Sequence, residues 1–229
     1  MSSPTLLAVA HGSRHPAAQE TISVLARQVR RLAPVLNVRV AFIQHAEPSL
    51  SSELSTAGPR AVIVPLLLSA GYHLATDIAG AASAAGARLA GPLGPDPLLV
   101  TALAGRLAEA GVPDGTPVVL AAAGSSDPQA AGEVQAQADL LAAELGVPVA
   151  VGYTAAGWPT VSDAVADLRT KTNGPVAVAT YLLAPGQFHD RLARSGGDWV
   201  TAPLGAHPAV AALVIDRYRA HRTPVARAA

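Results

Sequence analysis

The chain has 229 residues, and its 16 basic and 16 acidic side chains give a formal net charge of zero. Half of the residues are hydrophobic, enough to bury a sizeable core, and no stretch gathers the basic and aromatic residues that a nucleic-acid surface requires. Cysteine is absent, which excludes disulfides, thiolate nucleophiles and cysteine-ligated clusters, so a metal ion must bind through histidine or oxygen ligands.

Short apolar runs that suit strands alternate with stretches of helical spacing in the first half of the chain. This alternation is typical of a parallel, doubly wound sheet. Pro48 is expected to open a helix, because proline at the first helical position gives up only an unpaired N–H group. In chain order the expected elements are a strand at residues 5–10, a helix through Ile22 and Leu32, a strand at 38–43, a helix from Pro48, a strand at 60–68, a helix from about Ala75 and a strand at 88–93.

The same series of motifs occurs a second time further along the chain. AVAHGSRHP at 8–16 matches AAAGSSDP at 121–128 with an offset of 112 residues. EPSL at 47–50 matches WPTV at 158–161, and PLGPDP at 92–97 matches PLGAHP at 203–208, both with an offset of 111. A nearly constant offset across three separated motifs indicates an internal duplication. We therefore predict two homologous α/β halves, residues 1–113 and 114–229, joined near the turn-forming residues 112–116.

The N-terminal apolar run is too short for a signal peptide, and no window holds about 18 uninterrupted apolar residues. A chain of this length suits one large domain or two small domains of about 100 residues each. We therefore expect a cytoplasmic protein with no membrane segment and no nucleic-acid partner.

Histidine and glutamine residues stand where strands of the first half are expected to end. His11 follows the first strand, Gln44 and His45 end the second, and His73 follows the third. Ligands bind beyond the carboxyl ends of the strands in open α/β sheets, so these side chains suit a metal or acid–base site. The second half has Ala123 at the position of His11. The repeated scaffold therefore accepts a small apolar residue there, which favours a functional role for His11.

The His-Gly-Ser-Arg turn after the first strand has two interpretations. Gly12, Ser13 and Pro16 suit a tight turn in which the serine caps the following helix. The backbone N–H groups of such a turn also suit an anion, for example a carboxylate. Arg14 and Arg191 are candidate partners for substrate carboxylates, although a solvated position accounts for them as well.

The other histidines leave similar alternatives open. His73 is either a ligand that Asp77 orients from four residues later, or a solvated residue at a helix start. His189, in the sequence LLAPGQFHDRL, occupies a related loop of the second half and faces either the site or solvent. Positions near helix ends are typical of surface residues and are held by His15, His207 and His221.

Taken together, these motifs resemble the sirohydrochlorin chelatase family, which includes the cobalt- and iron-inserting class II chelatases, in its long, two-domain form. The resemblance lies in AHGSRHP at 10–16, FIQHAEPSL at 42–50, PLLLSAGYHLATDI at 65–78, GSSDP at 124–128 and YLLAPGQFHDRL at 181–192. It implies two similar α/β halves with a tetrapyrrole held in the cleft between them. The first half would carry the metal site, and the second, a degenerate repeat, would complete the substrate cleft.

The resemblance also implies roles for individual residues. His11 and His73 are expected to bind a divalent ion, Fe²⁺, Co²⁺ or Ni²⁺, as the substrate metal and to accept the pyrrole protons, with no organic cofactor. Many family members have glutamate at the position of Gln44, whose amide can coordinate weakly through oxygen but cannot carry charge or take a proton. Contacts with the tetrapyrrole are expected from Gly12, Ser13, Arg14 and His189.

We therefore expect a chelatase that inserts Fe²⁺ or Co²⁺ into sirohydrochlorin or a related tetrapyrrole in siroheme or cobalamin biosynthesis, acting as a monomer or weak homodimer. One alternative is a non-catalytic metal or tetrapyrrole binding protein on the same scaffold, which would bind stoichiometrically without turnover. Another is a small-molecule α/β enzyme such as a phosphate-ester isomerase, which would use the His-Gly-Ser-Arg turn as an anion site and would not depend on His73.

Overall fold

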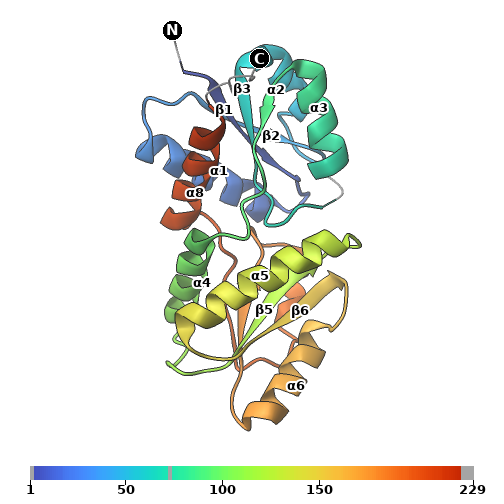
Figure 1. Cartoon of the computed structure of the whole chain (residues 1–229), viewed down its shortest axis with the longest axis vertical. Coiled ribbons are helices and arrows are strands. Elements are labelled where there is room, and N and C mark those ends of the chain that lie inside the picture. The colour runs from blue at the N-terminus through green and yellow to red at the C-terminus, as the bar shows by residue number, and fades with distance from the viewer. Residues whose placement is uncertain (1–2, 72–73, 223–229) are drawn as a thin grey trace, which may run out of the picture.

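The computed structural model describes residues 3–71 and 74–222, which form two four-stranded parallel sheets, one in each half of the chain (Figure 1). The strand orders are β2-β1-β3-β4 and β6-β5-β7-β8, so both sheets begin with an inner strand and have the same topology. The predicted fold of two similar, doubly wound α/β halves is thus confirmed.

The inner strands carry apolar residues on both faces because helices cover both sides of each sheet. Every residue of β3 and β7 is buried. The first strand occupies the predicted residues, whereas the third is shorter than the range 60–68 and the fourth contains only two residues. The strands are β1 (Thr5–Ala10), β2 (Val38–Phe42), β3 (Ala61–Pro65), β4 (Arg88–Leu89), β5 (Val118–Gly124), β6 (Val149–Ala156), β7 (Ala177–Tyr181) and β8 (Trp199–Val200).

Several helices begin at proline, at matching places in the two halves. Pro16 and Pro128 open matching helices in the two halves, and so do Pro97 and Pro208. The helices are α1 (Pro16–Leu32), α2 (Leu50–Ala57), α3 (Ala79–Ala85), α4 (Pro97–Glu109), α5 (Pro128–Leu145), α6 (Val161–Thr172), α7 (Gln187–Leu192) and α8 (Pro208–His221), with a short 3₁₀ helix at Gly58–Arg60 and a π-helical segment at Leu74–Ile78.

The expectation that Pro48 opens a helix is wrong. Helix α2 begins two residues later, at Leu50, because Ser49 is its N-cap. The Ser49 hydroxyl accepts a hydrogen bond from the Ser52 N–H at 3.3 Å, which satisfies a backbone donor at the helix start. The Glu47 carboxylate accepts the Ser49 N–H at 2.7 Å. Pro48 therefore belongs to the turn that leads into the helix.

Two helices cross from one half of the molecule to the other. Helix α4 follows the first sheet in sequence but packs against α5 and β7 of the second half (Figure 1). Helix α8 ends the second half in sequence but packs against α1 and β3 of the first. Arg217 on α8 donates to the carbonyl oxygens of Pro92 and Leu93 at 2.9 and 2.8 Å, and Arg106 on α4 donates to Leu204 at 2.8 Å. A single core cluster consequently contains side chains of both sheets.

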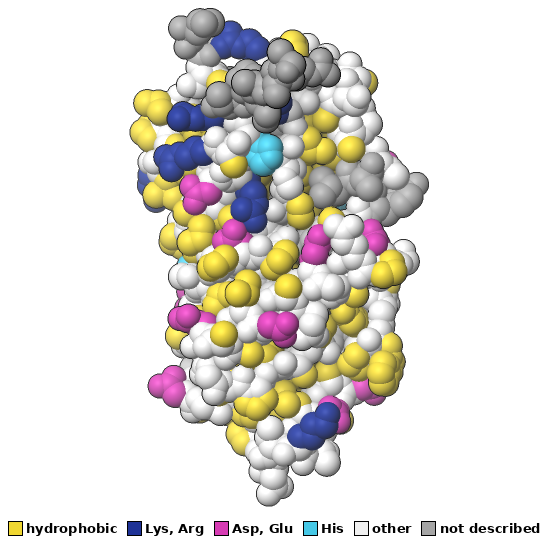
Figure 2. Space-filling view, viewed as in Figure 1, with side chains coloured by type: hydrophobic (Ala, Val, Ile, Leu, Met, Phe, Trp, Pro, Cys, Tyr) yellow, Lys and Arg dark blue, Asp and Glu magenta, His cyan; other side chains and the backbone are white. Residues whose placement is uncertain are grey.

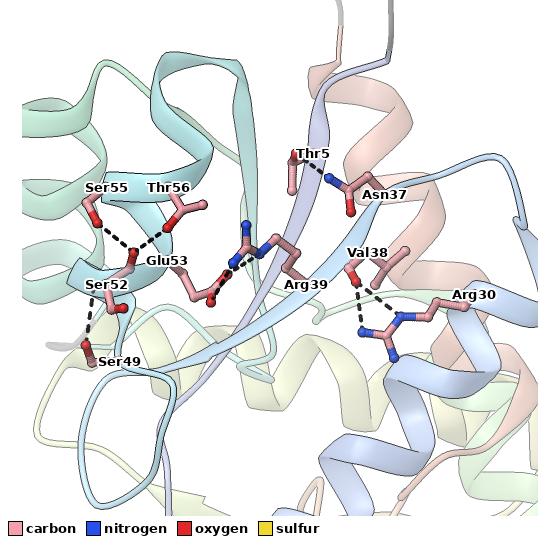
Figure 3. Close-up of polar contacts among 10 residues, drawn as sticks. All are labelled: Thr5, Arg30, Asn37, Val38, Arg39, Ser49, Ser52, Glu53, Ser55 and Thr56. Atoms are coloured by element: carbon pink, nitrogen blue, oxygen red, sulfur yellow. Dashed lines mark hydrogen bonds and ion pairs between the residues drawn. The ribbon is translucent and has the colours of Figure 1, made fainter.

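Polar contacts fix the outer helix α2 to the edge of the first sheet (Figure 3). Arg39, in the edge strand β2, forms an ion pair with Glu53 of α2, whose side chain is almost fully buried. On the other side of this strand, Arg30 of α1 donates two hydrogen bonds to the Val38 carbonyl oxygen, at 3.1 and 2.8 Å. The edge strand is thus held from both neighbouring helices.

Among the residues that the structure describes, no helix has the length and apolar character needed to cross a membrane. On the face shown in Figure 2, Arg side chains gather over the first half, at the top, whereas Asp and Glu are spread over the middle and lower parts. This face therefore carries charges of both signs, in keeping with the balanced charge of the chain.

Candidate functional site

The turn after β1 lies tightly against the end of β2. The Gln44 N–H donates to the His11 carbonyl oxygen at 3.0 Å, which extends the pairing of the two strands beyond their last residues. Gly12 has a φ of 95°, and a Cβ atom placed on it would lie 1.7 Å from the Gln44 carbonyl oxygen. Only glycine fits this backbone, as the sequence predicted for a tight turn. The close approach places His11 and Gln44 side by side at the carboxyl edge of the sheet.

The side chains of His11 and Gln44 also meet. The amide nitrogen Nε2 of Gln44 lies 2.8 Å from the imidazole Nε2 of His11. An amide nitrogen can only donate, so the imidazole nitrogen accepts this hydrogen bond. The same lone pair is the one that a metal ion would use. Gln44 is exposed and His11 is partly exposed, so both side chains can be reached from solvent.

Ser13 does not cap helix α1, contrary to the interpretation of the turn as a serine cap. The N-cap residue is His15, which makes no side-chain capping bond. The Ser13 hydroxyl instead accepts the His15 N–H at 3.0 Å, and its carbonyl oxygen accepts the Gln19 side-chain amide at 2.9 Å. These bonds stabilise the turn itself and leave Arg14 exposed at its tip.

A cleft of about 900 Å³ opens between this turn and the second half. The volume lies within the range of about 300–1,000 Å³ that is typical of small-molecule sites. A smaller apolar recess beside His11 and Gly12 is lined by residues such as Phe42, Leu66 and Leu183. The residues that line the large cleft are 11–16, 18 and 45 of the first half and 182–190 of the second. The cleft thus contains His11 together with the four predicted substrate contacts, Gly12, Ser13, Arg14 and His189.

The second half supplies the opposite wall from the loop after β7 and from α7. His189 is partly buried, with its Nε2 atom 3.4 Å from the Thr201 carbonyl oxygen. Phe188 beside it is 40% exposed, and the Arg191 guanidinium lies 5.5 Å from the centre of its ring. Arg191 also donates to the Thr154 carbonyl oxygen at 3.1 Å. This arginine is therefore engaged within the protein.

The repeat reproduces the backbone of the His11 turn without its polar side chains. Gly124 has a φ of 88°, and a Cβ atom on it would lie 1.6 Å from the Ala156 carbonyl oxygen. Ala123 and Ala156 therefore occupy the positions of His11 and Gln44. The polar pair at the strand ends, His11 and Gln44, therefore occurs in the first half and is replaced by two alanines in the second.

His45 follows Gln44 at the end of the second predicted strand, and neighbouring side chains within a strand would point to opposite faces. Strand β2 ends at Phe42, so this alternation does not extend to His45. Its φ is 62°, and the side chain is exposed and lines the cleft. The offsets of the repeat, 112 residues at the first motif and 111 at the second, do not fix the counterpart of His45 in the second half.

His73 lies outside the described residues, so its place relative to His11 stays a prediction. Asp77 lies in the segment Leu74–Ile78 and is exposed. Within residues 3–71 and 74–222, no group of three or more His, Asp or Glu side chains gathers in a way that would hold a metal ion.

The remaining histidines serve the helix ends. His207 is the N-cap of α8, where its Nδ1 atom accepts the Ala209 N–H at 3.2 Å. Burial and the nearby charge of Arg106 lower its pKa below the ordinary histidine value. His221 Nδ1 lies 2.9 Å from the Arg217 carbonyl oxygen, at the other end of the helix.

Comparisons with known proteins agree with this architecture. The model of the CbiX family matches residues 5–110 and, a second time, residues 117–221. The sirohydrochlorin ferrochelatase of Bacillus subtilis is 25% identical over an alignment of 235 positions that covers 93% of this chain and 90% of that protein. The sirohydrochlorin cobaltochelatase of Methanosarcina acetivorans is 30% identical over 79 residues, but the match covers only 33% of this chain and 61% of that protein.

Among solved structures, SirB from Bacillus subtilis with Fe³⁺ superposes with a TM-score of 0.80 at 25% identity and covers 94% of both chains. The similarity therefore extends over both halves and includes the way in which they are joined.

Proposed function

Because the chain belongs to the CbiX family, we propose that it is a chelatase that inserts Fe²⁺ or Co²⁺ into sirohydrochlorin or a closely related tetrapyrrole, as in siroheme or cobalamin biosynthesis. The observation that carries the proposal is the place of His11, which stands at the carboxyl edge of β1 in the wall of a cleft of about 900 Å³. The relatives named as iron and cobalt chelatases support the same reaction.

His11 is proposed as a ligand of the incoming ion. A neutral imidazole suits borderline divalent ions such as Fe²⁺, Co²⁺ and Ni²⁺, and few protein ligands hold the ion without trapping it. Insertion into a free-base macrocycle forms four metal–nitrogen bonds, removes the water ligands of the ion and releases two pyrrole protons. We propose that His11 and His73 bind the ion and then accept these protons as the ring nitrogens replace them.

Gln44 is proposed as a weak third ligand. Its amide nitrogen now donates to His11 Nε2, and a half-turn of the amide would direct its oxygen toward a metal ion bound at that nitrogen. A neutral amide adds no charge to the site, so the ion would remain easy to transfer.

The cleft is proposed to hold the macrocycle so that the metal ion lies against one of its faces. Both walls come from the same chain, so the proposed reaction needs only one molecule of the protein. Arg14 is exposed in the cleft and suits the carboxylates that sirohydrochlorin carries at its rim. Gly12, Ser13 and His189 line the same space. Holding both reactants in one geometry replaces a slow encounter by a positioned transfer.

An anaerobic absorbance assay tests the proposal. Sirohydrochlorin in excess over protein is mixed with Fe²⁺, Co²⁺ or Ni²⁺, and metallation is followed for wild type, His11→Ala and His73→Ala. His221→Ala, at the last residue of α8, is the control for loss of a histidine. We expect many turnovers for the wild type and the control, and at least a roughly 100-fold slower rate for the two site variants.

Two results would overturn the proposal. Stoichiometric binding of metal or tetrapyrrole without turnover in the wild type would assign the chain to a carrier. Wild-type rates in both site variants would show that the two histidines do not carry the reaction.

A further inference from the structure

His45 adopts a backbone conformation that disfavours side chains. Its φ of 62° lies in the left-handed region, where the Cβ atom of an L-residue crowds the backbone. Among the described residues, only Asn173 shares a positive φ without being glycine. Asn173 ends helix α6, a position where asparagine is common. His45 ends no helix, so a helix cap does not explain its conformation.

The second half shows what the backbone requires at this position. Gly12 and Gly124 make the same close approach, the first to Gln44 and the second to Ala156. The residue after this contact is His45 in the first half and Gly157, with a φ of 117°, in the second. A glycine satisfies the turn in one repeat. The first half instead places an imidazole there, in a conformation that is unfavourable for an L-residue.

The His45 side chain lies in the same cleft as His11. It is exposed and lines the cleft of about 900 Å³. The residue before it, Gln44, is joined to His11 twice, through its backbone N–H at 3.0 Å and its side-chain amide at 2.8 Å. An imidazole thus follows directly on the residue that contacts His11. Backbone strain is often retained where a side chain has a task in a binding site.

We propose that His45 is a metal ligand of the cleft, which takes the divalent ion from solvent and passes it to His11. This assignment rests on the proposed chelatase function. The two imidazoles and the Gln44 amide between them are all donors that borderline divalent ions accept. A single exposed imidazole binds such an ion weakly. Weak binding suits a residue that has to release the ion to His11.

The test uses the residue that the other repeat supplies. His45→Gly removes the imidazole and relieves the backbone, and His45→Asn removes it while keeping a polar side chain that tolerates a left-handed φ. His221→Ala is the control. Co²⁺ is titrated into the metal-free protein without tetrapyrrole and followed by its visible absorption, and each variant is melted thermally. We expect Co²⁺ to bind at least about tenfold more weakly to both His45 variants, and His45→Gly to melt at or above the wild-type temperature.

Unchanged Co²⁺ affinity in both variants would overturn the assignment. Unchanged affinity together with a raised KM for sirohydrochlorin would also overturn it, because the imidazole would then contact the macrocycle instead. The titration contains no tetrapyrrole, so it is separate from the test of the reaction: a wild type that binds Co²⁺ without turnover defeats the chelatase proposal and leaves the His45 comparison intact.

Discussion

Replacing Gly12 by alanine should separate the two strand ends that form the candidate site. The new Cβ atom would lie 1.7 Å from the Gln44 carbonyl oxygen, and ordinary contact begins near 3.4 Å, so the backbone of the turn must move by about 1.7 Å. The hydrogen bond from the Gln44 N–H to the His11 carbonyl oxygen, now 3.0 Å long, would stretch with it. His11 would then no longer face Gln44 as it does in the native turn.

The expected loss of stability follows from these contacts. A positive φ costs an L-residue about 1–2 kcal/mol, and the weakened hydrogen bond adds about 1 kcal/mol. A total of about 2–3 kcal/mol would lower the melting temperature by roughly 4–12 °C for a chain of this size. Since a misplacement of about 1 Å in a reactive geometry can cost roughly 100-fold in rate, we expect metallation of sirohydrochlorin by Gly12→Ala to slow by at least that factor.

Gly124→Ala is the matched control for this prediction. Its φ of 88° and its 1.6 Å approach to Ala156 reproduce the same conflict in the half that has no His11. Melting followed by circular dichroism should therefore show similar losses for the two variants. Metallation assays well below the lower melting temperature should show a large loss only for Gly12→Ala. Equal rates in both variants, or a Gly12→Ala protein that melts like wild type, would refute the reasoning.

Two further predictions concern buried polar groups. The Tyr181 hydroxyl donates to the Leu68 carbonyl oxygen at 3.0 Å, and burial raises its pKa well above the ordinary value. Tyr181→Phe removes this hydrogen bond and should lower the free energy of unfolding by about 1–2 kcal/mol in urea titrations. An unchanged urea midpoint would contradict this prediction. The lowered pKa of His207 means that the unfolded chain takes up a proton which the folded chain resists, so stability should fall as pH drops through about 6.5. His207→Asn keeps a capping side chain and should lose less stability between pH 7.5 and 5.5; an equal loss would show that another group is responsible.

The strands were predictable because burial and turn residues mark them directly. Strand β1 is apolar after Thr5 and stops at the His-Gly pair, so its bounds follow from the sequence. The start of α2 was misplaced because two helix-start signals stand next to each other, and the capping bond of Ser49 prevailed over Pro48. Ser13 was misjudged for a related reason, since its hydroxyl reaches only two residues ahead. Such short-range competition between hydrogen bonds is decided by geometry.

The candidate site was predictable in its members but not in its contacts. The sequence placed His11 and Gln44 at one sheet edge, and the structure brings their side chains to 2.8 Å. The left-handed turn after β2 brings His45 into the wall of the cleft, and strand alternation could not predict this placement. Periodicity also shows which face of a helix is buried but not which sheet covers it, so the exchange of α4 and α8 was not foreseen. The division of the repeat at residues 113 and 114 stays a prediction.

The exchange of α4 and α8 bears on how either repeat could exist by itself. Residues 1–113 would keep a helix whose apolar face belongs on the second sheet and would lack the helix that covers β3. In a dimer of two identical repeats, the last helix of each copy could pack against the sheet of the other copy. The duplicated chain therefore has the topology of a fused, helix-swapped dimer. Interlocked in this way, the two walls of the cleft rest on one shared hydrophobic core, and the macrocycle proposed to bind there would meet walls that this core joins.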